Sequence, residues 1–279
     1  MQRGRVIQTL AVTIGLLLAI AGCSSDSKPA ASSSPPASSS AAPPRALRIL
    51  VSNDDGVGAP GIDSLVEALR AEPNVEITVV APAQNQSGSG GKTTPGGVSA
   101  SPAKTVSGFD ATAVNGFPAD AVDYGLDSVV TEKPDVVISG VNLGQNLGPA
   151  VDLSGTVGAA RAAAQQGIPA LAVSAGLGDP VDFTTPTGLA IDWLREHRDA
   201  LLAGGAGPTT VDNLNAPTCG TGKVRGLAEV PADATVPLDQ ALGASIDCSS
   251  TVAQPGTDVA AFNAGFATLS QVPLTPATG

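Results

Sequence analysis

From Leu47 onwards, short apolar runs alternate with stretches whose apolar residues recur at helical spacing. The runs 47–51, 75–81, 136–138 and 170–173 have the length and composition of buried strands. Helical stretches lie between them, so consecutive strands must be joined by crossover connections rather than by hairpins. The alternation therefore predicts an α/β fold with a mainly parallel sheet, in which ligands collect at the carboxyl ends of the strands.

The first expected helix opens at Pro60, and its apolar positions Ile62, Leu65, Val66 and Leu69 follow the spacing i, i+3, i+4, i+7. Two further helices are expected over 156–166, which is rich in alanine, and over 186–202. The single histidine, His197, lies in the last of these stretches among charged residues, where we expect a solvated face.

The N-terminal sequence has the pattern of a targeting signal. An apolar run of signal-peptide length ends in Ile20-Ala21-Gly22-Cys23, which resembles a bacterial lipobox. The resemblance implies that residues 1–22 are a signal peptide and that Cys23 carries diacylglycerol; ordinary secretion, with Cys23 incidental, is the alternative. Residues 23–46 are rich in Ser, Ala and Pro and are expected to form a tether. The functional body is expected over 47–279.

These features predict an extracytoplasmic protein that contacts the bacterial cell membrane through its N-terminal lipid only. In an oxidising compartment, the two remaining cysteines, Cys219 and Cys248, are expected to form a disulfide. Two unpaired thiols are the alternative.

Composition excludes several functions. The net charge of −11 argues against a nucleic acid polymer as partner, because binding to phosphate backbones needs clustered Lys and Arg. With one histidine, Ser-His-Asp catalysis and multi-histidine zinc sites are improbable. The remaining chemistry belongs to carboxylates, hydroxyls, amides and a hard metal ion.

Asp54 and Asp55 lie at the carboxyl end of the first expected strand, after Ser52 and Asn53. Two adjacent carboxylates at a concave strand end repel each other unless a cation joins them, and oxygen ligands favour Mg²⁺, Mn²⁺ or Ca²⁺. The alternative is that Asp54 caps the following turn while Asp55 faces solvent.

Small oxygen-bearing side chains and glycines follow two other strands, over 85–88 and 139–148. Ser154, Gly155 and Thr156 then open the alanine-rich helix, whose N-terminus would bind phosphate. Ser154 acting only as a helix cap is the alternative.

The glycines of Gly56-Val57-Gly58-Ala59-Pro60-Gly61 match a dinucleotide-binding fingerprint. That site needs an acidic residue at the end of the second strand, and this strand ends in Val80-Ala81-Pro82 instead. Gly91-Lys92-Thr93 likewise lacks the first glycine of a P-loop. We set both nucleotide-cofactor readings aside.

Four blocks in order then resemble the SurE (survival protein E) nucleotidases: 52–62, 81–88, 139–148 and 154–157. Pro118-Ala119-Asp120 and the segment 257–266 are similar to further elements of that family. The strongest resemblance covers 47–175, whereas 176–279 is divergent and contains the cysteine pair.

This resemblance implies a Rossmann-like three-layer fold and metal-dependent hydrolysis of nucleoside 5′- or 3′-monophosphates, with Mg²⁺ or Mn²⁺ favoured over Ca²⁺. It also makes a homodimer an expectation. The metal ligands implied by the resemblance are Asp54, Asp55, Ser87 and Asn142. Either aspartate could act as the catalytic group, and Asn53, Asp120 and Asn146 are expected near the substrate. The competing hypothesis is a catalytically weak or silent, lipid-tethered nucleotide-binding protein.

Overall fold

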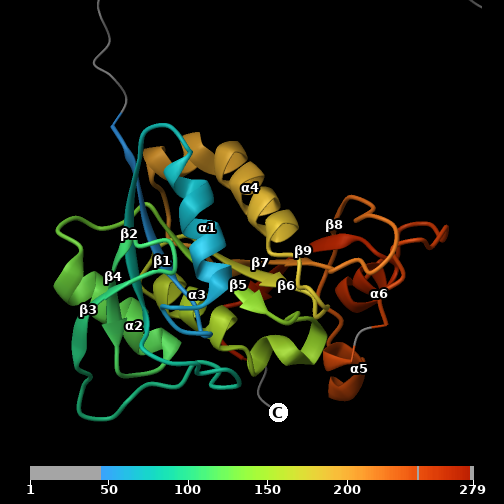
Figure 1. The fold of residues 1–279 in the computed structure, drawn as a ribbon, viewed down its shortest axis with the longest axis horizontal. Helices are drawn as coiled ribbons and strands as arrows, with labels where there is room; N and C mark the ends of the chain where they lie inside the picture. Colours follow the sequence, from blue (N-terminus) through green and yellow to red (C-terminus); the bar gives the residue numbers. More distant parts are fainter. Residues whose placement is uncertain (1–44, 244, 277–279) are drawn as a thin grey trace, which may run out of the picture. The chain divides into compact units, whose positions relative to one another are not determined.

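A computed structural model describes residues 45–243 and 245–276 (Figure 1). The expected signal peptide, Cys23 and nearly all of the expected tether lie outside these residues. Within them, nine strands form one sheet in the order β3-β4-β2-β1-β5-β6-β7-β9-β8. The strands are β1 (Leu47–Ser52), β2 (Val75–Pro82), β3 (Ala100–Lys104), β4 (Asp110–Val114), β5 (Val136–Leu143), β6 (Ala170–Ala175), β7 (Thr210–Ala216), β8 (Leu227–Glu229) and β9 (Ala267–Pro273).

The centre of the sheet is parallel. β1 lies between β2 and β5, and β5, β6 and β7 continue in the same direction. β3 pairs antiparallel with β4, and β9 antiparallel with β7. The predicted α/β class with a mainly parallel sheet is confirmed.

Helices cover both faces of the sheet. They are α1 (Pro60–Arg70), α2 (Pro118–Tyr124), α3 (Gly155–Gln165), α4 (Thr184–Ala203), α5 (Leu238–Leu242) and α6 (Asp258–Asn263), with a π-helical turn η1 (Gly125–Val129) and a 3₁₀ turn η2 (Gly148–Asp152). α1 and α4 share one apolar core with the sheet, and α2 and α3 share a second core on the opposite face. The result is a three-layer arrangement (Figure 1).

Helix α1 forms where the sequence predicts it, and its four spaced apolar residues are fully buried. A Cβ at Gly61 would lie 1.9 Å from the carbonyl oxygen of Val141, so glycine lets the helix rest on the backbone of β5. The alanine-rich helix, α3, begins at Gly155, one residue before the predicted start. Its short side chains allow similarly close packing, and a Cβ at Gly158 would lie 2.0 Å from the carbonyl oxygen of Gly90.

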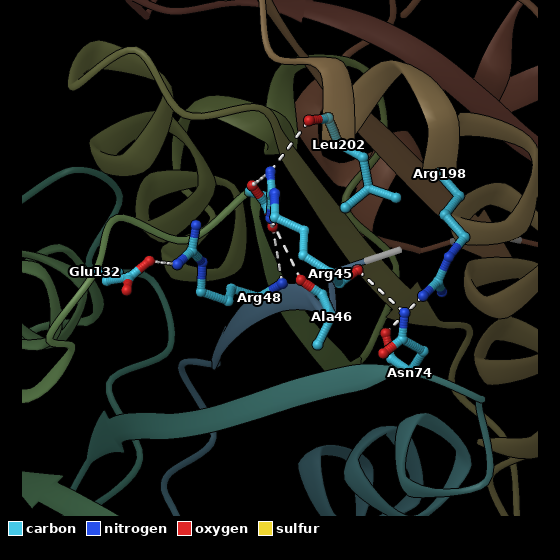
Figure 2. Close-up of polar contacts among 8 residues, drawn as sticks. Arg45, Ala46, Arg48, Asn74, Glu132, Arg198 and Leu202 are labelled. Atoms are coloured by element: carbon cyan, nitrogen blue, oxygen red, sulfur yellow. Dashed lines mark hydrogen bonds and ion pairs between the residues drawn. The ribbon is translucent and has the colours of Figure 1, made fainter. Parts of the chain in front are cut away.

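The chain enters the fold at the amino-terminal ends of the strands (Figure 2). Arg45 donates two hydrogen bonds to Asp135, at 2.7 and 2.8 Å, and one to the carbonyl oxygen of Leu202 at the end of α4. The Asn74 amide donates to the carbonyl oxygen of Arg45, at 3.0 Å. Arg45, which was assigned to the tether, therefore makes specific contacts with the folded body.

The C-terminal part extends the sheet and packs beside the end of β5. Cys219 and Cys248 form a disulfide, as predicted from the cysteine count. Phe262 of α6 is fully buried against Leu147 and Ala150. Among the described residues, no helix is both long and apolar enough to cross a membrane.

The prediction for His197 is wrong in part. The ring is half-buried rather than solvated, because it stacks on Trp193 with ring centroids 4.4 Å apart. Its Nδ1 lies 2.8 Å from the carbonyl oxygen of Trp193, one helical turn earlier. Trp193 and Leu201 belong to the core.

Candidate active site

Three parallel strand ends meet at one edge of the sheet. β1 ends at Ser52, before Asp54 and Asp55 and with only Asn53 between Ser52 and Asp54, while its neighbour β5 carries Asn142 near its own end. On the other side, β2 ends at Pro82 and leads into the loop that contains Ser87. The topology therefore brings together the chain segments that carry the four expected metal ligands.

A tight turn after β1 presents the two aspartates. The Asn53 side chain donates to the carbonyl oxygen of Gly56, at 2.9 Å, and accepts from the Gly56 amide, at 3.2 Å. Gly56 has φ of 102°, which favours glycine. Asn53 was expected near the substrate; it is fully buried, and its visible role is to shape this turn.

Asp54 is buried against the first turn of α3. Thr156 Oγ1 donates a hydrogen bond of 2.6 Å to Asp54 Oδ1. Burial raises the pKa of Asp54 to about 6, and the charge of Asp55 adds to the increase, although the hydrogen bond from Thr156 opposes it. A carboxyl group with a pKa this close to neutrality can exchange a proton under physiological conditions.

Asp55 links the ends of the two neighbouring strands. The Asn85 amide donates to Asp55 Oδ1, at 3.0 Å, and the Leu143 backbone N–H donates to Asp55 Oδ2, at 2.9 Å. Burial raises the pKa of Asp55, and these two hydrogen bonds reduce the increase. Asp55 is half-buried, so the site has one enclosed and one more open carboxylate.

Ser87 and Asn142 complete the expected ligand set. Ser87 is exposed, and its backbone N–H donates to Asn85 Oδ1, so the residue that contacts Asp55 also orients Ser87. Asn142 is buried, and its Nδ2 donates to the carbonyl oxygen of Gly144, at 2.6 Å. This bond leaves Asn142 Oδ1 buried without a hydrogen-bond partner in the protein.

These residues fit a hard divalent cation. The unpartnered Asn142 Oδ1 and the two carboxylates are oxygen donors of the type that Mg²⁺ and Mn²⁺ prefer. A cation would also favour the ionised form of Asp54, which burial alone disfavours. Over the described residues, no three His, Cys, Asp or Glu side chains group closely enough to hold a metal. The candidate site therefore depends on its serine and amide oxygens.

The expected phosphate site lies at the N-terminus of α3. Ser154 Oγ accepts from the Val157 N–H, at 3.1 Å, so Ser154 does cap the helix. A Cβ at Gly155 would lie 2.9 Å from Asp54 Oδ2, which explains the glycine there. The Thr156 hydroxyl donates to Asp54, so it is already engaged rather than free to bind phosphate.

Sequence reasoning missed Ser89. Its hydroxyl is buried without a partner and lies 2.9 Å from the position of a Cβ at Gly155. It therefore borders the helix N-terminus and Asp54. The alternating serines and glycines of 87–90 are the only sequence signal that points to this residue.

Asp120 and Asn146 have structural partners. The Asp120 carboxylate accepts from the backbone N–H and hydroxyl of Thr94 and from the Phe117 N–H, so it joins a loop to the start of α2. The Asn146 amide donates to Ser174 Oγ, and its backbone N–H donates to Asn215 Oδ1. Both residues hold loops that surround the strand ends.

A three-layer α/β body with paired aspartates at the carboxyl end of its central strand and a helix N-terminus beside them is the architecture of a phosphate-handling protein. The comparisons with known proteins define the family. The model of the family "Survival protein SurE" matches residues 49–235. This chain belongs to the SurE family.

Similar proteins and a solved structure support the same family. The chain is 42% identical over 185 residues to a "5'-nucleotidase SurE" of Methanopyrus kandleri, covering 61% of this chain and 66% of that protein. It is 35% identical over 236 residues to a "5'/3'-nucleotidase SurE" of Cronobacter sakazakii, covering 80% and 89% respectively. The crystal structure of SurE from Aquifex aeolicus matches with a TM-score of 0.65 at 27% identity, covering 83% of this chain and 95% of that one.

Proposed function

We propose that this protein is a divalent-metal-dependent phosphomonoesterase that hydrolyses nucleoside 5′- or 3′-monophosphates. The names of the relatives support the reaction class. The observation that carries the proposal is the convergence of Asp54, Asp55 and Asn142 at adjacent strand ends, where the Asn142 amide oxygen is buried without a protein partner and the next residue, Leu143, donates to Asp55. We propose Mg²⁺ or Mn²⁺ as the cation, with Ca²⁺ as the third choice, and Asp54, Asp55, Ser87 and Asn142 as its ligands.

The protein residues have separable roles in this reaction. A bound cation would polarise a phosphoryl oxygen of the substrate and lower the pKa of a water molecule that it binds. Asp54, held by Thr156, is placed to accept a proton at a carboxylate oxygen. The backbone N–H of Gly155, at the positive end of α3, is placed to donate to a phosphoryl oxygen. Asn53 and Asn85 orient the two carboxylates rather than contact the phosphate.

The test uses the purified protein with AMP, 3′-AMP and p-nitrophenyl phosphate before and after chelation. We expect turnover that chelation abolishes and that Mg²⁺ or Mn²⁺ restores. Asp54→Asn should lower kcat by at least about a hundredfold, whereas Asp110→Asn, an exposed aspartate that pairs with Lys104, should leave it unchanged. Binding of AMP without turnover at saturating metal would instead support the silent nucleotide-binding protein.

We further propose that the mature protein is a lipoprotein on the outer side of the bacterial cell membrane. The lipobox-like sequence before Cys23 supports this location, and a disulfide is typical of an oxidising compartment. Mass spectrometry of the N-terminal peptide from membranes should find diacylglycerol on Cys23. Release of unmodified protein into the medium would contradict the anchor. A homodimer remains a prediction. Light scattering of residues 47–279 in solution without detergent can test it.

A further inference from the structure

The hydroxyl of Ser89 is buried and has no hydrogen-bond partner among the described residues. The residue is 7% exposed, so bulk water does not replace the missing partner. A buried hydroxyl without a partner costs free energy, and such groups are uncommon in folded proteins. Ser52 and Ser139 share this property inside strands β1 and β5, whereas Ser89 lies in a loop against the N-terminus of α3.

The backbone on both sides of Ser89 is fixed. Its N–H donates to the carbonyl oxygen of Gln86, at 3.3 Å, and its carbonyl oxygen accepts from the Lys92 N–H, at 3.2 Å. The N–H of the next residue, Gly90, donates to the carbonyl oxygen of Leu153, at 3.0 Å, just before the N-cap of α3. The Ser89 hydroxyl is therefore held in place beside the first turn of this helix, as a preorganised binding group requires.

The other two hydroxyls at this helix end already have partners in the chain. The Thr156 hydroxyl donates its proton to Asp54, at 2.6 Å. The Ser154 hydroxyl oxygen accepts from the Val157 N–H, at 3.1 Å, and so caps the helix. Of these three hydroxyls, that of Ser89 is the one with no internal partner, so its proton remains available to a group outside the chain.

The partner that fits this position is an anionic oxygen. The N-terminus of an eleven-residue helix offers backbone N–H groups and the positive end of the helix dipole. Gly155 carries no side chain, so a ligand can approach this end closely. Ser89 Oγ and Asp54 Oδ2 each lie 2.9 Å from the position that a Cβ at Gly155 would take. The hydroxyl thus borders both the helix end and one carboxylate of the proposed cation site.

We propose that Ser89 contacts the substrate: its hydroxyl donates a hydrogen bond to a phosphoryl oxygen bound at the N-terminus of α3. The inference rests on the proposed nucleotidase function and deepens it, because it adds a donor from outside the helix and outside the proposed metal ligands. The protein leaves this donor unsatisfied, and the substrate supplies its acceptor. Hydrogen bonds to charged oxygens are the stronger ones, so one such donor contributes measurably to phosphate affinity.

The test compares Ser89→Ala with the wild-type protein at saturating Mn²⁺. Inorganic phosphate is the probe, and its dissociation constant is measured by titration calorimetry. We expect the variant to bind phosphate about 10- to 100-fold more weakly, with a similar loss in kcat/KM for AMP. Mn²⁺ affinity without phosphate should stay at the wild-type value. The thermal midpoint of the ligand-free variant should be equal to or higher than that of wild type, because the lost hydroxyl has no partner in the free protein.

Ser270→Ala is the matched control. Ser270 is also buried, but its hydroxyl donates to the carbonyl oxygen of Val230, at 2.7 Å, in the C-terminal part of the sheet. This variant should have a lower thermal midpoint and wild-type phosphate affinity. The two serines therefore predict opposite outcomes, since one hydroxyl serves the fold and the other serves the ligand.

Wild-type phosphate affinity in Ser89→Ala would overturn the assignment. A loss of Mn²⁺ affinity as large as the loss of phosphate affinity would also overturn it, because Ser89 would then act at the metal. Ser89→Cys keeps a similar shape with a weaker donor and should lie between wild type and Ser89→Ala; it decides the question if Ser89→Ala does not fold. If the wild-type protein hydrolyses neither AMP nor p-nitrophenyl phosphate, the nucleotidase function fails, and the phosphate titration still decides the role of Ser89.

Discussion

Asp54 accepts a hydrogen bond of 2.6 Å from the hydroxyl of Thr156, across 102 residues of sequence. The bond joins the end of the central strand to the first turn of α3, so the carboxylate and the helix N-terminus are positioned as a unit. Because Thr156 is fully buried, the contact is shielded from water and is stronger than a surface hydrogen bond. The catalytic proposal therefore depends on how this pair sets the protonation of Asp54.

The first prediction concerns stability against pH. The pKa of Asp54 is about 6 in the folded protein and near 3.8 when unfolded, so the folded state binds more protons between these values. The contribution of Asp54 to the free energy of unfolding of the metal-free protein should therefore be most favourable below pH 4. It should fall by about 3 kcal/mol through this group as pH rises to about 6.

Asp54→Asn removes this ionisation. In chelator at pH 7.5, the variant should unfold at a higher temperature than wild type, and the difference should shrink as pH is lowered towards 4. Thermal denaturation over that range measures it. A variant that is destabilised at pH 7.5 by the same amount as at pH 4 would contradict the assignment.

The second prediction concerns Thr156. Thr156→Val keeps the shape but removes the donor, so the pKa of Asp54 should rise further. The acid limb of the kcat profile should move up by about one pH unit. Thr156→Ser should restore the wild-type profile. The control is Thr187→Val, which removes another buried threonine hydroxyl, bonded to Ser64 on the opposite face of the sheet. It should leave the profile in place.

The sequence predicted the parallel sheet and the common edge of the site because strand and helix periodicity are local properties. It also placed Asp54, Asp55 and Asn142 at strand ends. The partners of these residues are set by packing between distant segments, which spacing does not encode. The roles of Asn53 in its turn and of Asp120 in its loop therefore became visible only in three dimensions.

The same limit explains the other differences. Thr156 stays in the expected phosphate site at the start of α3, but its hydroxyl also donates to Asp54, which the sequence did not predict. His197 was expected in solvent, but Trp193 one turn earlier covers its ring. Ser89 was overlooked because its burial against Gly155 follows from the close contact of its loop with α3. The surroundings of Thr156, His197 and Ser89 are thus set by contacts with other side chains or segments, and the sequence alone does not reveal these contacts.

The third prediction concerns the amide oxygen of Asn142. Asn142→Ala should weaken Mn²⁺ binding by about 10- to 100-fold, measured by titration calorimetry without substrate. Asn142→Asp keeps an oxygen donor and should retain binding. Asn115→Ala, which removes an exposed asparagine bonded to Ser99, is the control. Wild-type Mn²⁺ affinity in Asn142→Ala would remove this residue from the ligand set.

The fourth prediction concerns the entry of the chain into the fold (Figure 2). Burial favours protonation of Asp135, but hydrogen bonds from Arg45 and from the Arg48 N–H outweigh it and lower the pKa of Asp135. The ionised carboxylate thus stabilises the folded state above its unfolded pKa, and this contribution is lost as pH falls through the lowered folded value.

Asp135→Asn should therefore reduce the thermal midpoint at pH 7, and the reduction should fade as pH approaches 3. Asp110→Asn, at an exposed ion pair with Lys104, should change the midpoint little at either pH. A deficit of Asp135→Asn that persists unchanged at pH 3 would show that the charge of Asp135 is not the cause. The site should be unaffected, because Asp135 lies at the opposite ends of the strands from Asp54.

The fifth prediction separates the disulfide from the active site. Cys219 and Cys248 are 29 residues apart, and closing such a loop stabilises the folded state by about 3–4 kcal/mol in the chain-entropy model. The double variant Cys219→Ser, Cys248→Ser should have a free energy of unfolding lower by that amount, measured by denaturant titration. Its metal affinity should stay at the wild-type value, because the four proposed ligands lie between Asp54 and Asn142, outside the closed loop. Among the described residues, Gln145 is one contact between the strand ends and this loop, because it donates to the carbonyl oxygen of Leu242. Loss of metal binding in the folded double variant would mean that the C-terminal part holds the strand ends in place.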